Sequence, residues 1–129
     1  MTPLLKINIP GHLIGQTLAP RAAGGFYRPK NYRECLRKCK LFVKLAIARS
    51  PIACDFPIKG KVIVNISGRR FGGYDQDKFM GTVYDALQFG GAVKNDRQCK
   101  LGAFTVTNDL TKLDKHEKEY TEVEIYLLP

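Results

Sequence analysis

A chain of 129 residues with a formal net charge of +9 at pH 7 is long enough to form one domain around a continuous hydrophobic core. Its apolar runs are far shorter than the ~20 residues that span a bilayer, and its start holds no apolar stretch with a cleavage site. The sequence therefore predicts a soluble, unexported, cytoplasmic protein that folds as a single domain over residues 1–129.

The four cysteines are predicted to be reduced thiols, because a domain of this size does not need disulfides and no Cys-x-x-Cys pair occurs. Cys35 and Cys39 would be neighbours on a helix and could supply half of a zinc site. Neither His12 nor His116 has the spacing to complete that site. We expect the two cysteines to pack as small hydrophobic side chains.

Charge is divided unevenly along the sequence. Residues 1–70 hold fourteen Lys and Arg against two acids, whereas residues 71–129 hold seven against ten. A strongly basic surface attracts a polyanion such as a nucleic-acid backbone. The first half is therefore the predicted binding half, and the second half holds the candidate chemistry.

The first predicted strand covers residues 4–10, where apolar and polar side chains alternate. A turn-rich segment, residues 11–29, follows and contains Phe26 and Tyr27 beside Arg28. Such a segment can be a mobile loop that stacks on exposed bases or wedges into a duplex. It can equally be a loop that its aromatic side chains pin to the core, and we favour this second interpretation.

The first predicted helix has Asn31 as its N-cap and runs to about Ala48. One stripe is apolar at spacings of three and four: Leu36, Cys39, Phe42, Val43, Ala46 and Ile47. The opposite face is basic, with Glu34 as the one acid: Arg33, Arg37, Lys38, Lys40 and Lys44. Because like charges at this density oppose folding, the face is either a solvated surface or a contact for an anion.

A β-branched strand is predicted over residues 59–67, followed by a flexible basic loop, residues 68–73, that contains Arg69 and Arg70. The second helix is predicted over residues 75–89, where apolar side chains keep helical spacing until a glycine pair ends it. This loop would carry two arginines next to the start of the helix.

Two more strands are predicted over residues 100–107 and 122–127. A highly charged segment, residues 108–121, joins them, most simply as an antiparallel hairpin with a mobile tip. The order is then β-α-β-α-β-β. It predicts an α+β fold in which one mixed sheet packs against two helices.

Asp75 and Asp77 open the second helix, and Asp96 follows a short distance beyond it. In a basic chain, clustered carboxylates repel a polyanion unless divalent metal lies between them, so the combination predicts metal-dependent cleavage of a nucleic-acid backbone. The alternative is that these acids are helix caps or solvated side chains. Asp85 lies ~12 Å along the helix from Asp77, too far to share one ion, and we expect it to be either a structural acid or an acid that supports the metal ligands without binding the ion.

Three blocks of the sequence resemble the RusA family of Holliday junction resolvases, and their separations agree with the family pattern. The blocks are Tyr74-Asp75-Gln76-Asp77-Lys78, Tyr84-Asp85-Ala86-Leu87 and Asn95-Asp96-Arg97-Gln98. The run Tyr32-Arg33-Glu34 is similar to a further family pattern near the start of the first helix.

The resemblance implies that Asp75, Asp77 and Asp96 are catalytic acids that bind Mg²⁺, or Mn²⁺ in its place. It also implies a homodimer, since a four-way DNA junction has approximate two-fold symmetry and needs two matched cuts. The implied function is endonucleolytic resolution of such junctions in DNA recombination and repair, in the cytoplasm of a bacterial or phage-infected cell.

The sequence departs from the family pattern at three positions. Asn95 stands where the family often has an acid, Lys78 where it has asparagine, and Gly81 where it has a catalytic lysine. We expect Lys78 to supply the missing cation, with Lys94 and the two loop arginines as alternatives. The predicted nucleic-acid contacts are basic residues from both halves of the chain: Arg28, Lys30, Arg33, Arg37, Arg69, Arg70 and Lys94.

The rival interpretation is a non-catalytic or weakly catalytic protein that binds branched nucleic acid through the basic helix and the aromatic loop. The three acids would then be caps. A sugar-nucleotide transferase also uses an Asp-x-Asp pair, but this chain has no glycine loop that cradles phosphates and is too small for the usual nucleotide domain.

Overall fold

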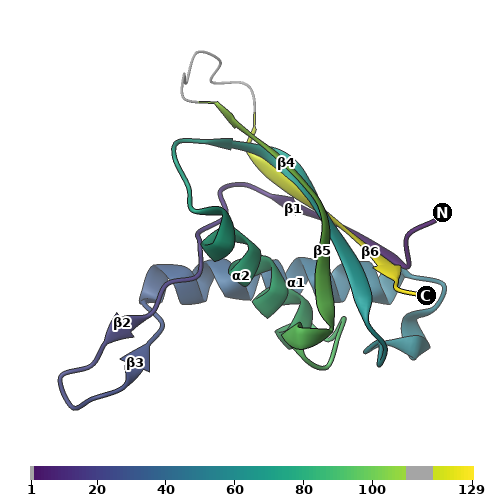
Figure 1. The fold of residues 1–129 in the computed structure, drawn as a ribbon, viewed down its shortest axis with the longest axis horizontal. Helices are drawn as coiled ribbons and strands as arrows, with labels where there is room; N and C mark the ends of the chain where they lie inside the picture. Colours follow the sequence, from purple (N-terminus) through teal and green to yellow (C-terminus); the bar gives the residue numbers. More distant parts are fainter. Residues whose placement is uncertain (1, 110–117) are drawn as a thin grey trace.

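A computed structural model describes residues 2–109 and 118–129 of the chain (Figure 1). Four strands form one mixed sheet in the order β1-β6-β4-β5: β1 (Leu5–Pro10), β4 (Val62–Phe71), β5 (Cys99–Asp109) and β6 (Tyr120–Leu127). Two helices lie against the sheet, α1 (Lys30–Arg49) and α2 (Gln76–Phe89). The predicted α+β fold with a mixed sheet and two helices is confirmed.

Three short elements were not predicted. A two-stranded hairpin of β2 (Ala19–Pro20) and β3 (Phe26–Tyr27) projects from the body of the protein next to the start of α1 (Figure 1). The 3₁₀ turns η1 (Ala53–Asp55) and η2 (Asp96–Gln98) follow α1 and α2. In the described part of the chain, no helix combines the length and the apolar composition that crossing a bilayer requires.

The core forms where the apolar stripes of the helices meet one face of the sheet. Every second residue of β4 from Val62 onward is buried, as strand geometry requires when one face is covered. Cys35 and Cys39 are buried in α1, which confirms that they pack as hydrophobic side chains, and all four cysteines are free. The largest fully buried side chains come from both helices and three strands: Tyr32, Val43, Phe79, Leu87, Ile7, Ile66 and Ile125.

The predicted hairpin between the last two strands is wrong. β5 pairs in parallel with β4, whereas β6 lies antiparallel between β1 and β4. Thr121, Val123 and Ile125 of β6 are buried, which suits a central strand, and β5 occupies the edge. The tip predicted to be mobile falls mainly on residues 110–117, outside the described residues.

The predicted basic loop over residues 68–73 is also wrong in part, because β4 continues through Phe71. Gly68 has φ +150°, and a Cβ atom there would collide with the carbonyl group of Tyr120 in β6. A glycine is therefore needed for the close approach of the two strands. The strand delivers Arg70 to the covered face, where it is 8% exposed.

The first helix begins two residues earlier than predicted. Pro29, not Asn31, is the N-cap residue, and its carbonyl accepts the Arg33 N–H at 3.0 Å. The fixed φ of proline suits the start of a helix. The Asn31 side chain instead accepts the N–H of Tyr32 at 2.8 Å.

Candidate functional site

The first two acids of the motif lie at the N-terminal end of α2. Asp75 is the N-cap, and its carboxylate accepts the Lys78 N–H at 3.2 Å. Asp77 lies in the first turn, where negative charge is favourable because free N–H groups gather there. Both are exposed. Asp75 therefore has a structural use that does not prevent its other carboxylate oxygen from binding a ligand.

Asp96 lies beyond the other end of the same helix, in η2. The Gln88 side chain of α2 accepts the Asp96 N–H at 3.3 Å, which ties the turn to the helix. Asn95 caps the turn, since its side chain accepts the Arg97 N–H at 2.9 Å while the Gln98 side chain accepts the Asn95 N–H at 2.9 Å. The capping hydrogen bond of its side chain therefore gives Asn95 a structural role at this position.

The three acids are not brought together within one chain. Asp75 and Asp77 stand at one end of the 14-residue helix α2 and Asp96 at the other (Figure 1), and a helix of that length is roughly 21 Å long. Among residues 2–109 and 118–129, no group of three or more His, Cys, Asp or Glu side chains could hold a metal ion. A single chain therefore does not fit the predicted Mg²⁺ site.

Asp85, in the middle of α2, is buried, and one of its carboxylate oxygens has three partners. Its Oδ2 accepts the Tyr32 hydroxyl at 2.8 Å and the Gln16 amide at 2.9 Å, and Arg28 lies 3.6 Å away. Burial and then the hydrogen bond to Asp85 raise the pKa of the Tyr32 hydroxyl far above its ordinary value. Asp85 is a structural acid, one of the two roles that the sequence predicts, and it joins α1, α2 and the segment after β1.

Gly81 leaves room for Gln16. A Cβ atom at position 81 would lie 2.5 Å from Gln16 Oε1 and 3.1 Å from its Cβ. The Gln16 N–H also donates to the Lys78 carbonyl at 2.8 Å, so the segment after β1 runs along this face of α2. A lysine at position 81 would displace the side chain that bonds Asp85, whereas Lys78 itself is exposed.

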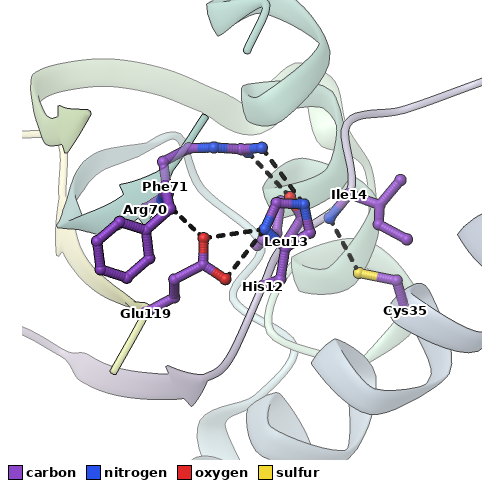
Figure 2. A network of polar contacts seen from close by, with 7 residues as sticks. All are labelled: His12, Leu13, Ile14, Cys35, Arg70, Phe71 and Glu119. Atoms are coloured by element: carbon purple, nitrogen blue, oxygen red, sulfur yellow. Dashed lines mark hydrogen bonds and ion pairs between the residues drawn. The ribbon is translucent and has the colours of Figure 1, made fainter. Parts of the chain in front are cut away.

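Arg70 is part of an internal network (Figure 2). Its guanidinium donates to the Leu13 carbonyl at 3.0 Å and lies 3.4 Å from His12 Nε2. His12 Nδ1 in turn lies 3.1 Å from Glu119, which also accepts the Phe71 N–H at 2.7 Å. Arg70 is therefore engaged inside the protein, and its expected place in an exposed loop is wrong.

Glu119 shows how this network favours a charged carboxylate. Partial burial opposes its charge, but the hydrogen bonds from Phe71 and His12 and the charge of Arg70 outweigh burial and lower the pKa of Glu119. The network joins the start of β6 to the end of β4 and to the segment after β1.

The other predicted nucleic-acid contacts lie mainly along the exposed face of α1. Arg33 and Arg37 are exposed, and Lys30 is exposed beside Glu34 at 3.9 Å. A hollow of about 620 Å³ follows this face, lined by Glu34, Arg37, Lys38, Lys40, Leu41 and Lys44. Lys94 is exposed at the far end of α2, and Arg69 packs on the Phe71 ring with its guanidinium 5.6 Å from the centroid.

The aromatic residues of the hairpin do not pin it to the core, which corrects the favoured interpretation. Phe26 is 69% exposed and Tyr27 is 42% exposed. Arg28 makes the connection to the body instead, through Asp85 and through the Phe89 ring, whose centroid lies 5.2 Å from the guanidinium carbon. Arg21, which the sequence analysis did not select, packs on Tyr27 at 5.9 Å.

One signal for the basic surface of the hairpin and the start of α1 is present in the sequence, because no Asp or Glu occurs before Glu34.

Compared with profiles of known protein families and with curated protein sequences, the chain matches none.

Proposed function

We propose that the protein is a Mg²⁺-dependent endonuclease that recognises branched DNA and cuts four-way junctions as a homodimer. The observation that carries this proposal is that the three blocks resembling the RusA family form one structural unit around α2. Asp75 and Asp77 begin the helix, Asp85 fixes its middle, and Asp96 is tied to its end through Gln88.

The distribution of charge supports a DNA substrate. The exposed face of α1 presents Arg33, Arg37 and Lys44, and the acids of α2 lie on a different element. Such a basic surface attracts a phosphate backbone and releases its counterions on binding. Binding should therefore weaken steeply as salt is added.

The separation of the acids makes a second chain part of the proposal. β5 is an edge strand that begins three residues after Asp96 and ends beside the end of β4, from which the chain continues to Asp75. Antiparallel pairing of two β5 strands about a two-fold axis would bring the start of each near the end of the other. Asp96 of one copy would then approach Asp75 and Asp77 of its partner.

Mg²⁺ bound by such carboxylates would lower the pKa of a water and stabilise the leaving oxygen during phosphodiester hydrolysis. The residues of this chain would supply the ligands, the DNA contacts and one further cation. Lys78 is our choice for that cation, because it is exposed next to Asp77, whereas Arg70 is held inside the protein.

Mixing two inactive variants tests both the activity and the shared site. Asp75→Asn and Asp96→Asn should each bind a labelled four-way junction without cutting it. After subunit exchange, about half of the dimers in a one-to-one mixture contain one copy of each variant, and each of these mixed dimers has one intact site of its two. The mixture should therefore regain about a quarter of the wild-type sites. Nicked junction in the presence of Mg²⁺ is the measured product.

A mixture of Asp75→Asn with Asp77→Asn is the matched control, because both changes lie at the same end of α2 and no intact site can form. Cutting by either single variant alone would contradict the site assignment. Recovery in the control mixture would contradict the shared site.

The second candidate is a protein that binds branched DNA without cutting it. The distance between the acids within one chain and the exposed aromatic hairpin favour it. Wild-type protein that binds the junction tightly but yields no product with either Mg²⁺ or Mn²⁺ would identify this second function.

A further inference from the structure

The β2–β3 hairpin presents two aromatic rings to solvent, those of Phe26 and Tyr27, although the chain has a hydrophobic core. Phe26 is the most exposed of the large hydrophobic residues of the described chain, at 69%. Leaving such a ring in water forgoes the stabilisation that its burial would bring. The hairpin is nevertheless ordered by its backbone: the Arg21 N–H donates to the Gly25 carbonyl at 3.0 Å, the Gly24 N–H donates to the Arg21 carbonyl at 3.0 Å, and Gly24 and Gly25 adopt the positive φ values that the turn needs.

Three arginines surround the base of the hairpin. A hollow of about 350 Å³ is lined by Arg21, Tyr27, Arg28 and Arg33. Asp85 is the acid that approaches this group, and its side chain is 7% exposed and already accepts two other hydrogen bonds. The hollow therefore keeps a strong excess of positive charge.

The hollow is anchored to the body of the protein. Arg28 is held between the carboxylate of Asp85 and the ring of Phe89. Arg33 is fixed in the first turn of α1, where its N–H bonds the Pro29 carbonyl at 3.0 Å. The planar guanidinium group of an arginine can contact phosphate oxygens in pairs.

We infer that this surface binds an unpaired nucleotide, with its base stacked on Phe26 or Tyr27 and its phosphates among Arg21, Arg28 and Arg33. The inference deepens the proposed function by naming the part of the branched DNA that the hairpin contacts. Stacking needs an exposed base face, which a continuous duplex does not offer but a branch point or a gap does.

An anionic membrane surface is the other macromolecule that aromatic and basic residues can contact. The nucleotide is favoured because the arginines enclose a hollow around Tyr27 instead of lying along an amphipathic helix. Their basic surface also continues onto α1 through Arg33 and Arg37, along the path that a phosphate backbone would follow.

The test uses full-length protein and two DNAs of the same length, one fully paired and one with a short single-stranded gap that contains 2-aminopurine. EDTA is present, so that binding is measured without cleavage. Wild-type protein should change the fluorescence of 2-aminopurine in the gap. Phe26→Ala or Tyr27→Ala should weaken binding to gapped DNA by about 5- to 100-fold, with less than about a twofold change for the paired duplex.

Two further variants serve as controls. Tyr120→Ala removes a comparably exposed ring, 48% exposed, from the start of β6 and should change neither measurement. Phe26→Trp keeps a stacking surface and should retain binding. Circular dichroism checks that each variant is folded.

Equal binding of wild type and both alanine variants to gapped DNA, with no fluorescence change, would overturn the inference. Loss of binding to anionic vesicles in these variants, with gapped DNA unaffected, would overturn it in favour of a membrane. Junction cutting is assayed separately with Mg²⁺: stacking without cutting contradicts the nuclease alone, and cutting without stacking contradicts the hairpin site alone.

Discussion

Two groups of arginine and aromatic side chains lie in opposite environments. At the end of β4, Arg70 packs on Tyr74 and Phe79 with its guanidinium carbon 5.0 and 5.7 Å from the ring centroids, and it is 8% exposed. In the hairpin, Arg21 packs on Tyr27 at 5.9 Å, and both residues face solvent. A guanidinium group packed on an aromatic ring therefore occurs in both regions.

The difference lies in what else the arginines bond. The Arg70 guanidinium donates to the Leu13 carbonyl and belongs to the network of His12 and Glu119, so its removal would leave the buried Leu13 carbonyl without this donor. Arg21 has no such internal network in the described part of the chain. An arginine beside an aromatic ring is therefore a structural element where its donors are used inside the protein, and a binding element where they point outward.

The largest expected effect is on stability. Arg70→Ala should lower the free energy of unfolding by about 2–5 kcal/mol, because it leaves a cavity beside Tyr74 and an unpaired Leu13 carbonyl. Arg21→Ala should change it by less than about 0.5 kcal/mol. Urea unfolding followed by circular dichroism measures both, and equal effects would remove the distinction between the two groups.

Asp85 links the hairpin to the buried face of α2, because it is buried itself and lies 3.6 Å from Arg28. Asp85→Asn should cost about 1–3 kcal/mol of stability, since it weakens the charged hydrogen bonds from Tyr32 and Gln16. The substitution should also weaken the ion pair between Arg28 and residue 85, so that the Arg28 side chain is held less firmly. Asp55→Asn is a suitable control because Asp55 is exposed, and a loss of similar size there would contradict this prediction.

Glu119 makes the stability contributed by the Arg70 network depend on pH. Its pKa is lower in the fold than in the unfolded chain, so its contribution is present above the ordinary pKa near 4.5 and is lost as the pH falls through the folded value. Glu119→Gln should cost about 1–2 kcal/mol at pH 7 and progressively less below about pH 4. Thermal unfolding at pH 7 and pH 3 compares the two proteins, with Glu34→Gln as the exposed control; a constant difference between the two pH values would be unexpected.

The smallest effect concerns Gly81. Alanine there favours the helix by about 1 kcal/mol but displaces Gln16 from Asp85, so the net change should be near zero. In a Gln16→Gly background, which removes all the side-chain atoms that a Cβ at position 81 would meet, Gly81→Ala should stabilise by about 1 kcal/mol, which a double-mutant cycle measures. An additive cycle would show that the two side chains do not compete.

Local periodicity predicted the strands and helices because each buries one face, and the helix over residues 75–89 agrees closely with α2. It did not predict the order of strands in the sheet, which depends on contacts between distant residues. Leu5 pairs with Ile125, and no pattern within either segment specifies the other.

The wrong prediction that Arg70 lies in a loop has a more local reason. Gly68, Gly72 and Gly73 made residues 68–73 resemble a loop, but the alternation of buried and half-buried residues in β4 continues to Phe71. The separation of the acids could have been anticipated, since a helix between Asp77 and Asp96 holds its ends apart.

The central place of β6 has a consequence for biosynthesis. Among the described strands β1 is hydrogen-bonded to β6 alone, so β1, which is synthesised before the other three strands of this sheet, has no partner in the sheet until residues 120–125 have also emerged. Sheet formation should therefore be a late event, completed after synthesis of most of the chain. A nascent chain arrested before Tyr120 should remain sensitive to protease along Leu5–Pro10, whereas one arrested with the whole of β6 outside the ribosome should be protected there.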